Sequence, residues 1–341
     1  QRLAQIQFEE SPDATEHDRS AYAAFELAYS TLVRQARRRS PPIVFIERER
    51  GARRGTNATM FSRIAGRGAR ICMLYPATGE AVTLYETTEG QILDLSPDYD
   101  GERILFSMRT KQREPFHTYE LTVASGQVEQ LNDGPWHDYS PVYYPDGRIV
   151  FSSSRVESFS MCQDFLACAL YAMKGNGSDI RRFDFTTLST LTPAVMPDGS
   201  IICSRWEYQD KNIFSWQGLW TINPNGTQLK LYYGNTLTVP NSLYGPKPIP
   251  GTDKVLYVMA AHHHPPIGDI AVVERSKGIE NPDASRKLTF ATPYEFRVGS
   301  DWQDNHNWQS GDKYYANAFT DPYPMNGDFS IASYGYDDMQ G

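Results

Sequence analysis

The sequence is poor in cysteine and in long apolar runs, and each shortage excludes a class of protein. Four cysteines among 341 residues are too few for a scaffold built on disulfides. No run of 18 apolar residues occurs, so we expect no membrane-spanning helix. Basic residues are also in deficit, with 33 Lys and Arg against 41 Asp and Glu and a net charge of -8. Because binding a phosphate backbone needs a basic face, this balance argues against nucleic acid as a partner.

Several signatures of catalysis and cofactor binding are also missing from the sequence. It contains no Gly-rich phosphate loop, no nucleophile elbow and no Cys-x-x-Cys-His haem attachment motif. We therefore expect neither nucleotide nor haem. The sequence begins at Gln1 without Met, as a processed chain would, and we expect a bacterial protein that is secreted or periplasmic.

What the sequence does contain is an internal repeat with a period of about 40 to 50 residues, which is typical of propellers and solenoids. Its core is a turn followed by an alternating strand, and the four clearest copies begin at Leu93, Tyr139, Leu191 and Tyr244. A loop and a second strand–turn–strand motif follow each copy, as in "TYELTVASGQVEQL". Pro-Asp-Gly supplies the first turn, and Asn-Gly or Ser-Gly the last.

Each unit is thus interpreted as four short antiparallel strands, and the fold class predicted is all-β. Four strands per unit, repeated radially, make a β-propeller blade. We predict one propeller domain over residues 43–341 with six or seven four-stranded blades, the last of them incomplete. Residues 1–42 differ in kind, because "DRSAYAAFELAYSTLVRQARRR" is apolar at helical spacing, and they predict an N-terminal helical extension packed on the barrel.

A propeller of this kind brings together residues that are far apart in the sequence. The 2–3 loops and the connections between blades open on one face, since strands alternate in direction. His117 is predicted in a 2–3 loop, His137 just before the first strand of the next blade, and Arg205 at the end of a second strand. We predict that these three residues share a face with the triple histidine at 262–264.

These residue types suggest acid–base chemistry on an acidic ligand. Imidazole is the usual general acid or base near neutral pH, and a guanidinium is suited to a carboxylate. The competing interpretations are that each His bonds a loop carbonyl and that Arg205 forms a buried ion pair with Glu207 or with a carboxylate of a neighbouring blade. Tyr244 is a candidate proton donor. Candidate substrate-binding residues are Tyr208, Trp206 and Glu207, although packing between blades would also account for Trp206.

A second group of residues suggests a metal. Cys162, Cys168, His262 and His263 lie in or beside 2–3 loops, and thiolate with imidazole suits a structural zinc ion. The spacing matches no known zinc finger. A disulfide between the two cysteines and a pair of free thiols stay open as alternatives.

The motifs "PVYYPDGRIVFSSSR", "SRWEYQD", "LWTINPNGT" and "IPGTDKVLYVMAAHH" resemble those of TolB-like exported propellers. They are most similar to the propeller domain of the hydrazine synthase alpha subunit and its relatives, over roughly residues 43–335. Relatives of that type carry Cys pairs and a His-His at the positions of the four residues just named, which implies a metal there. Hydrazine synthesis itself is not implied, because the haem motif is absent.

The site layout is also similar to that of propeller polysaccharide lyases, notably the ulvan lyases. Those enzymes use two His, an Arg and a Tyr on one propeller face. The resemblance implies that Arg205 neutralises a uronate carboxylate, while His117, His137 and Tyr244 supply base and acid. One departure is that the positions equivalent to His137 in the next two blades are Ser189 and Ser242.

The leading functional hypothesis is a secreted lyase that cleaves a uronate-containing polysaccharide, sulfated or not, by β-elimination. The alternative is a non-catalytic binding or scaffold propeller that docks a protein partner and holds a structural zinc ion. A third hypothesis is a metal-dependent hydrolase that uses the triple histidine.

Overall fold

The structure is a computed structural model that describes residues 27–28, 30–35, 37–38, 40–48, 67–159, 166–206, 217–237, 242–260, 268–289 and 318–335. Strands dominate this part of the chain, as predicted. The contacts divide the chain into two compact units, residues 1–44 with 73–82 and residues 45–72 with 83–341. Across the described ranges, no helix is both long and apolar enough to cross a membrane.

The predicted N-terminal helical extension falls mostly outside the described residues. Those that are described between 27 and 38 are helical, and almost all of them are exposed, Leu27 and Leu32 included. The first strands along the chain are β1 (Ile43–Arg48), β2 (Ala69–Tyr75) and β3 (Glu80–Thr87), which pair in that order into a three-stranded sheet.

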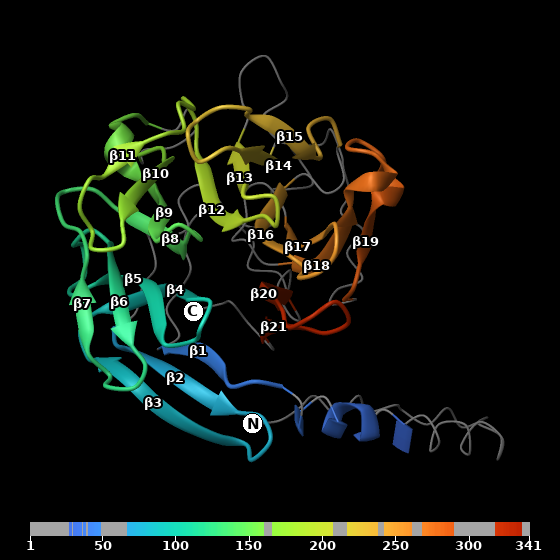
Figure 1. Cartoon of the computed structure of the whole chain (residues 1–341). Coiled ribbons are helices and arrows are strands. Elements are labelled where there is room, and N and C mark those ends of the chain that lie inside the picture. Colours follow the sequence, from blue (N-terminus) through green and yellow to red (C-terminus); the bar gives the residue numbers. More distant parts are fainter. Residues whose placement is uncertain are drawn as a thin grey trace, which may run out of the picture. The chain divides into compact units, whose positions relative to one another are not determined.

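The larger of the two compact units contains four successive antiparallel groups of four strands each (Figure 1). The strands are β4 (Gln91–Pro97), β5 (Arg103–Arg109), β6 (His117–Thr122) and β7 (Val128–Gln130); β8 (Asp138–Tyr143), β9 (Arg148–Ser153), β10 (Ala169–Lys174) and β11 (Arg181–Arg182); β12 (Thr190–Val195), β13 (Ile201–Trp206), β14 (Gln217–Ile222) and β15 (Lys230–Tyr233); and β16 (Ser242–Pro248), β17 (Lys254–Ala260), β18 (Gly268–Glu274) and β19 (Ser285–Lys287). A hairpin of β20 (Ala318–Pro324) and β21 (Ser330–Gly335) follows.

The first strands of neighbouring four-stranded groups contact one another. Strand β4 contacts β8, β8 contacts β12, β12 contacts β16, and β16 contacts β20. The first strand of each group therefore lies inward and the fourth strand outward, as Figure 1 shows for the larger compact unit. This is the radial arrangement of propeller blades. The number of blades in a closed ring stays a prediction.

Five inner strands share the same irregularity. In β4, β8, β12, β16 and β20 the register with the second strand shifts by a bulge. One residue in each bulge has a left-handed backbone with φ between 50 and 59°, namely Asp94, Ser140, Thr192, Gly245 and Asp321. A bulge bends its strand and redirects a side chain, so these five positions are equivalent by structure as well as by sequence.

The residues just before the bulges build a shared core. Leu93, Tyr139, Leu191 and Tyr244 are all at most 6% exposed and belong to one hydrophobic cluster with Phe116. Further apolar clusters fill the spaces between successive sheets. Because these contacts run between units, the inner strands are fixed relative to one another and give the neighbouring polar residues a rigid support.

The predicted Pro-Asp-Gly turns are confirmed. Between β8 and β9 the carboxylate of Asp146 accepts the N–H of Arg148 over 3.1 Å, and Gly147 takes φ of 88°. The same pattern recurs between β12 and β13, where Asp198 accepts the N–H of Ser200. The Asp side chain thus closes the turn, and Gly supplies the left-handed residue.

Candidate functional site

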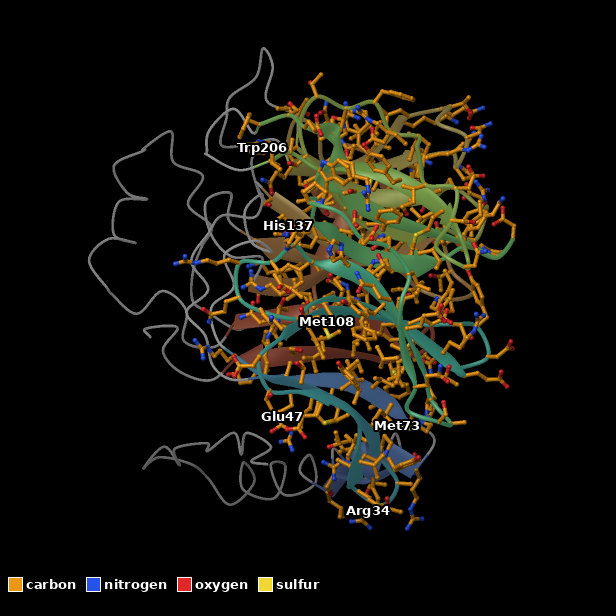
Figure 2. All side chains as sticks on the ribbon, turned by 90° about the vertical axis from the view of Figure 1, so that its left-hand side faces the viewer. Arg34, Glu47, Met73, Met108, His137 and Trp206 are labelled. Carbon is orange, nitrogen blue, oxygen red and sulfur yellow. The ribbon has the colours of Figure 1, made fainter. Side chains whose placement is uncertain are left out.

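The predicted site residues that the structure describes lie on one edge of the sheets. His117 is the first residue of β6, His137 directly precedes β8, and Arg205 is one residue from the end of β13. In an antiparallel sheet, the start of the first strand, the end of the second strand and the start of the third strand all lie at the same edge. The positions of the three residues therefore agree with the predicted common face. His137 and Trp206 lie on the same side of the larger unit in Figure 2. One detail was wrong, because His117 begins a strand instead of lying in a loop.

His117 faces a buried carboxylate from the neighbouring sheet. Its Nδ1 lies 3.7 Å from Oδ2 of Asp138, the first residue of β8. Asp138 has no exposed surface, and it accepts hydrogen bonds from Oγ of Ser153 at 2.6 Å and Nη2 of Arg155 at 2.8 Å. The carboxylate is therefore held in place from two sides. At 3.7 Å the contact between His117 and Asp138 is no hydrogen bond, and Nδ1 of His117 has no hydrogen-bond partner among the described residues. A carboxylate at this position would orient the ring and leave Nε2 for chemistry if the contact tightens when substrate binds.

His137 makes different contacts from His117. Its Nδ1 accepts the backbone N–H of Phe116 at 3.2 Å. Burial, with smaller contributions from the nearby Arg109 and His117, lowers the pKa of His137 to about 4. The ring is neutral near pH 7, and with Nδ1 used as an acceptor the proton sits on Nε2. His137 thus presents an N–H donor at its free nitrogen, which suits hydrogen bonding to an anion better than proton abstraction.

Sequence reasoning missed three charged residues at this edge, Asp138, Arg109 and Arg155. The guanidinium of Arg155 binds Asp138 and lies over the ring of Trp136 at 4.8 Å. That of Arg109 lies over Phe116 at 4.8 Å, and burial lowers its pKa. The available signal was the dipeptide His137–Asp138 at the start of a predicted inner strand. The dipeptide forms a site only because β6 of the preceding sheet lies beside it, and no local sequence pattern specifies that neighbour.

Arg205 forms the ion pair of the competing interpretation, and its partner is a carboxylate of the neighbouring blade. Its Nη1 lies 3.8 Å from Oδ1 of Asp184, a carboxylate that is 1% exposed, and its guanidinium lies over Trp220. Asp184 follows β11, so the pair joins two adjacent sheets. The ion pair is long, and the Arg205 side chain keeps 14% of its surface exposed.

A small pocket lies beside Arg205. It is lined by Ser189, Leu191, Ser204, Arg205, Trp206, Gln217 and Tyr244. Trp206 is only 4% exposed, which fits packing between sheets better than stacking on a sugar. Tyr244 is 5% exposed and occupies in β16 the position of Tyr139 in β8, directly before the bulge. Its role as a proton donor stays a prediction.

The register confirms the departure seen in the sequence. His137 lies three residues before the left-handed residue of its strand, and the same position is Gln91 in β4, Ser189 before β12 and Ser242 in β16. The backbone oxygens of His137 and Ser189 accept equivalent bonds, from the N–H groups of Ser154 and Trp206. The imidazole is therefore specific to one blade and is not demanded by the fold.

The predicted zinc site falls mostly outside the described residues, which do not include Cys162, His262 or His263; Glu207 and Tyr208 also lie outside them. Cys168 is described and is a buried free thiol whose pKa burial raises to about 12. A metal binds the thiolate, which this environment disfavours. The part of the chain that the structure describes holds no group of three or more His, Cys, Asp or Glu suited to a metal. Zinc stays a prediction.

Comparison with protein-family models gives no match, and none of the curated proteins matches. Solved structures do match. Hydrazine synthase from Kuenenia stuttgartiensis is similar to 92% of this chain, with a TM-score of 0.68 and 18% identity. The chain spans 44% of the length of that protein.

Two further matches are more distant. TolB from Acinetobacter baumannii aligns with 61% of this chain and 46% of its own, at 16% identity and a TM-score of 0.46. An oligogalacturonate lyase in complex with manganese aligns with 68% of this chain and 63% of its own, at 11% identity and a TM-score of 0.45. The resemblance to hydrazine synthase predicted from the sequence is confirmed. At 18% identity this match defines the fold, a β-propeller, and leaves the activity to be argued from the site.

Proposed function

We propose that this propeller is a carbon–oxygen lyase that cleaves a uronate-containing polysaccharide by β-elimination. The observation that carries the proposal is the pairing of His117 with the buried Asp138, beside a neutral His137 on the same edge. The arrangement supplies an oriented base next to a hydrogen-bond donor. These are two of the groups that proton abstraction next to a carboxylate requires.

The chemistry assigns each histidine a separate role. In β-elimination a base removes the proton on C5, the C4–O4 bond breaks, a C4–C5 double bond forms, and the departing O4 takes up a proton, which the protonated base can return. Nε2 of His117 is the proposed base, because Asp138 stands at its Nδ1 and stabilises the imidazolium that forms. The Nε2–H of His137 donates to the uronate carboxylate, whose negative charge rises as C5 loses its proton.

Arg205 is proposed to act one sheet further along the edge. The histidines lie where the β4–β7 sheet meets the β8–β11 sheet, whereas Arg205 lies where the latter meets the β12–β15 unit. A polysaccharide extends over several sugar units, so Arg205 suits the carboxylate of a neighbouring unit. It would then contribute to substrate binding in both ground and transition states.

The experiment is a panel of uronate polymers, such as ulvan, alginate and pectin, assayed by the ultraviolet absorbance of the unsaturated product. We expect one polymer to give this product, and His117→Ala to reduce the rate by about 10² to 10⁴. Absence of product from every uronate polymer, or full activity in His117→Ala, would contradict the proposal.

A second candidate is a non-catalytic propeller that binds a partner protein. It is favoured by the ion pairs Arg155–Asp138 and Arg205–Asp184, which partly neutralise the edge before any ligand arrives. This candidate predicts a stable complex in a pulldown from the native periplasm or secretome, bound zinc by metal analysis, and no turnover of any uronate polymer. The third hypothesis, a metal-dependent hydrolase, predicts that chelation abolishes turnover.

A further inference from the structure

Phe185 lies in the connection between β11 and β12, directly after Asp184, the carboxylate that pairs with Arg205. It is 74% exposed, the highest value among the large apolar side chains that the structure describes. Its neighbours in the chain are buried, with Asp184 1% and Thr186 5% exposed. An isolated phenyl ring therefore projects into solvent from a segment that is otherwise packed.

The backbone on both sides of Phe185 is fixed by hydrogen bonds. Nε of Arg182 donates to the carbonyl oxygen of Asp184 at 2.6 Å, and its Nη2 donates to that of Thr186 at 2.9 Å. The Asp184 carboxylate accepts the N–H of Thr186 at 3.1 Å and that of Leu170 in β10 at 3.4 Å. The segment is thus tied to its own sheet and is ordered before any ligand arrives.

One face of the Phe185 ring is covered by a charge of the same segment. The guanidinium of Arg182 lies over the ring at 5.2 Å from its centroid, a cation–π contact that restrains the side chain. Because the residue is 74% exposed, the opposite face of the ring is open to solvent. The connection leads into the start of β12, so this flat apolar surface lies at the same edge as Arg205.

The fold does not demand a ring at this position. In the preceding connection Asn132 accepts the N–H of Thr118 at 2.8 Å, as Asp184 accepts that of Leu170, and both donors are the second residues of their strands. The residue after Asn132 is Asp133, which is also exposed. A polar side chain thus serves the fold equally well here, and the exposed ring at the second junction points to a ligand.

Two chemical features lie close together at this junction. Phe185 offers an apolar face, and one residue away the Asp184 carboxylate lies 3.8 Å from the Arg205 guanidinium. A pyranose ring presents C–H groups that pack on an aromatic face, and a uronate adds a carboxylate that suits a guanidinium. A neutral sugar uses only the ring and a small anion uses only the guanidinium, so a uronate unit matches both.

We propose that Phe185 and Arg205 form a subsite for one uronate unit of a polysaccharide, with the sugar stacked on Phe185 and its carboxylate paired with Arg205. This inference rests on the proposed function, because it takes the same polymer as its ligand. Phe185 is a binding residue and takes no part in proton transfer. A unit held here fixes the register of the polymer along the edge, so that a neighbouring unit extends toward His117.

The test is native electrophoresis in gels that contain ulvan, alginate or pectin, in which a bound polymer slows the protein. We expect one of these uronate polymers to slow the wild type, and dextran, a neutral polysaccharide, to have no effect. Phe185→Ala should weaken the affinity about tenfold, since it removes the stacking face, whereas Phe185→Tyr should retain it. The matched control is Tyr99→Ala, which removes a ring that is 69% exposed in the turn between β4 and β5, at the opposite edge, and should leave binding unchanged.

The proposal is overturned if no uronate polymer slows the wild type, if Phe185→Ala binds as tightly, or if Phe185→Tyr is as weak as Phe185→Ala. Equal losses in Phe185→Ala and Tyr99→Ala also overturn it. Because the equivalent position holds an exposed polar residue, Phe185→Ala should fold as the wild type does, and thermal unfolding checks this.

The lyase proposal is judged by a different readout, the unsaturated product. Binding that depends on Phe185, without product from any polymer, overturns the lyase chemistry and leaves the subsite standing. Product from a polymer that Phe185→Ala binds undiminished overturns the subsite and leaves the lyase chemistry standing.

Discussion

The backbone N–H of Phe116 donates to Nδ1 of His137 over 3.2 Å, and this bond determines which ring nitrogen carries the proton. Two histidines on one edge could have exchanged the roles of acid and base. Because Nδ1 of His137 is occupied, its Nε2 carries hydrogen and has no lone pair to offer. His117 has Asp138 at its Nδ1 instead, which favours Nε2 as the base.

The first prediction concerns stability against pH. The pKa of His137 is about 4 in the folded chain, against an ordinary value of 6.5, so the unfolded chain binds the proton more readily. The contribution of the neutral ring is fully present above pH 6.5 and is lost as pH falls toward 4. This contribution of His137 to the free energy of unfolding is on the order of 3 kcal/mol.

His137→Asn tests this prediction, because the Asn side chain retains an oxygen acceptor for the Phe116 N–H but does not titrate. The free energy of unfolding, measured by denaturant titration between pH 4 and 6.5, should fall more steeply in the wild type than in the variant. Parallel curves would show that His137 does not stay neutral in the folded chain.

The second prediction separates the two histidines by kinetics. His117→Ala should lower kcat by about 10² to 10⁴, since it removes the base. His137→Asn keeps a polar group at the edge and should reduce kcat by less than His117→Ala does. The measurement is the initial rate at saturating polymer for both variants. Equal losses would mean that His137 shares the proton transfer.

The third prediction concerns the buried pair of Asp138 and Arg155. Asp138→Asn leaves the guanidinium without its carboxylate and should destabilise the fold by about 3 kcal/mol, with Arg155→Met having an effect of the same sign. The double variant should lose less than the sum, because neither charge is then stranded. Thermal and denaturant unfolding of the four proteins measure this coupling. Additive losses would show that the two groups do not interact.

The fourth prediction concerns Arg205. If Arg205 binds a uronate unit next to the cleaved one, Arg205→Met raises KM and leaves kcat nearly unchanged. Asp184→Asn is the matched variant, since it frees the guanidinium from its ion pair and should lower KM. Steady-state kinetics on the same polymer measure both. A loss of stability with KM unchanged in both variants would assign the pair to the fold alone.

Much of the fold was predictable because it depends on local signals that recur. The Pro-Asp-Gly turns and the alternation of each strand are encoded within a few residues, and the repeat aligned His137 correctly with Ser189 and Ser242. The common edge of His117, His137 and Arg205 followed from strand direction alone.

The parts that were missed depend on contacts between sheets. Asp138 meets His117 only because β8 lies beside β6 of the preceding unit, and Arg205 meets Asp184 across the next junction. The partner of a charged residue at such a junction is far away in sequence. The low pKa of His137 likewise comes from burial, which a loop-like sequence position does not indicate.

The bulge repeated in each inner strand has a consequence for how this chain acquires new binding properties. Its left-handed residue stands outside the regular ladder and tolerates Asp, Ser, Thr or Gly, while the residue before it supplies the core. The core contact and the variable polar side chain thus occupy adjacent positions of the same strand. Five such positions lie on the inner strands, and the side chain at each sets the charge or polarity presented there while the residue before it keeps its place in the core.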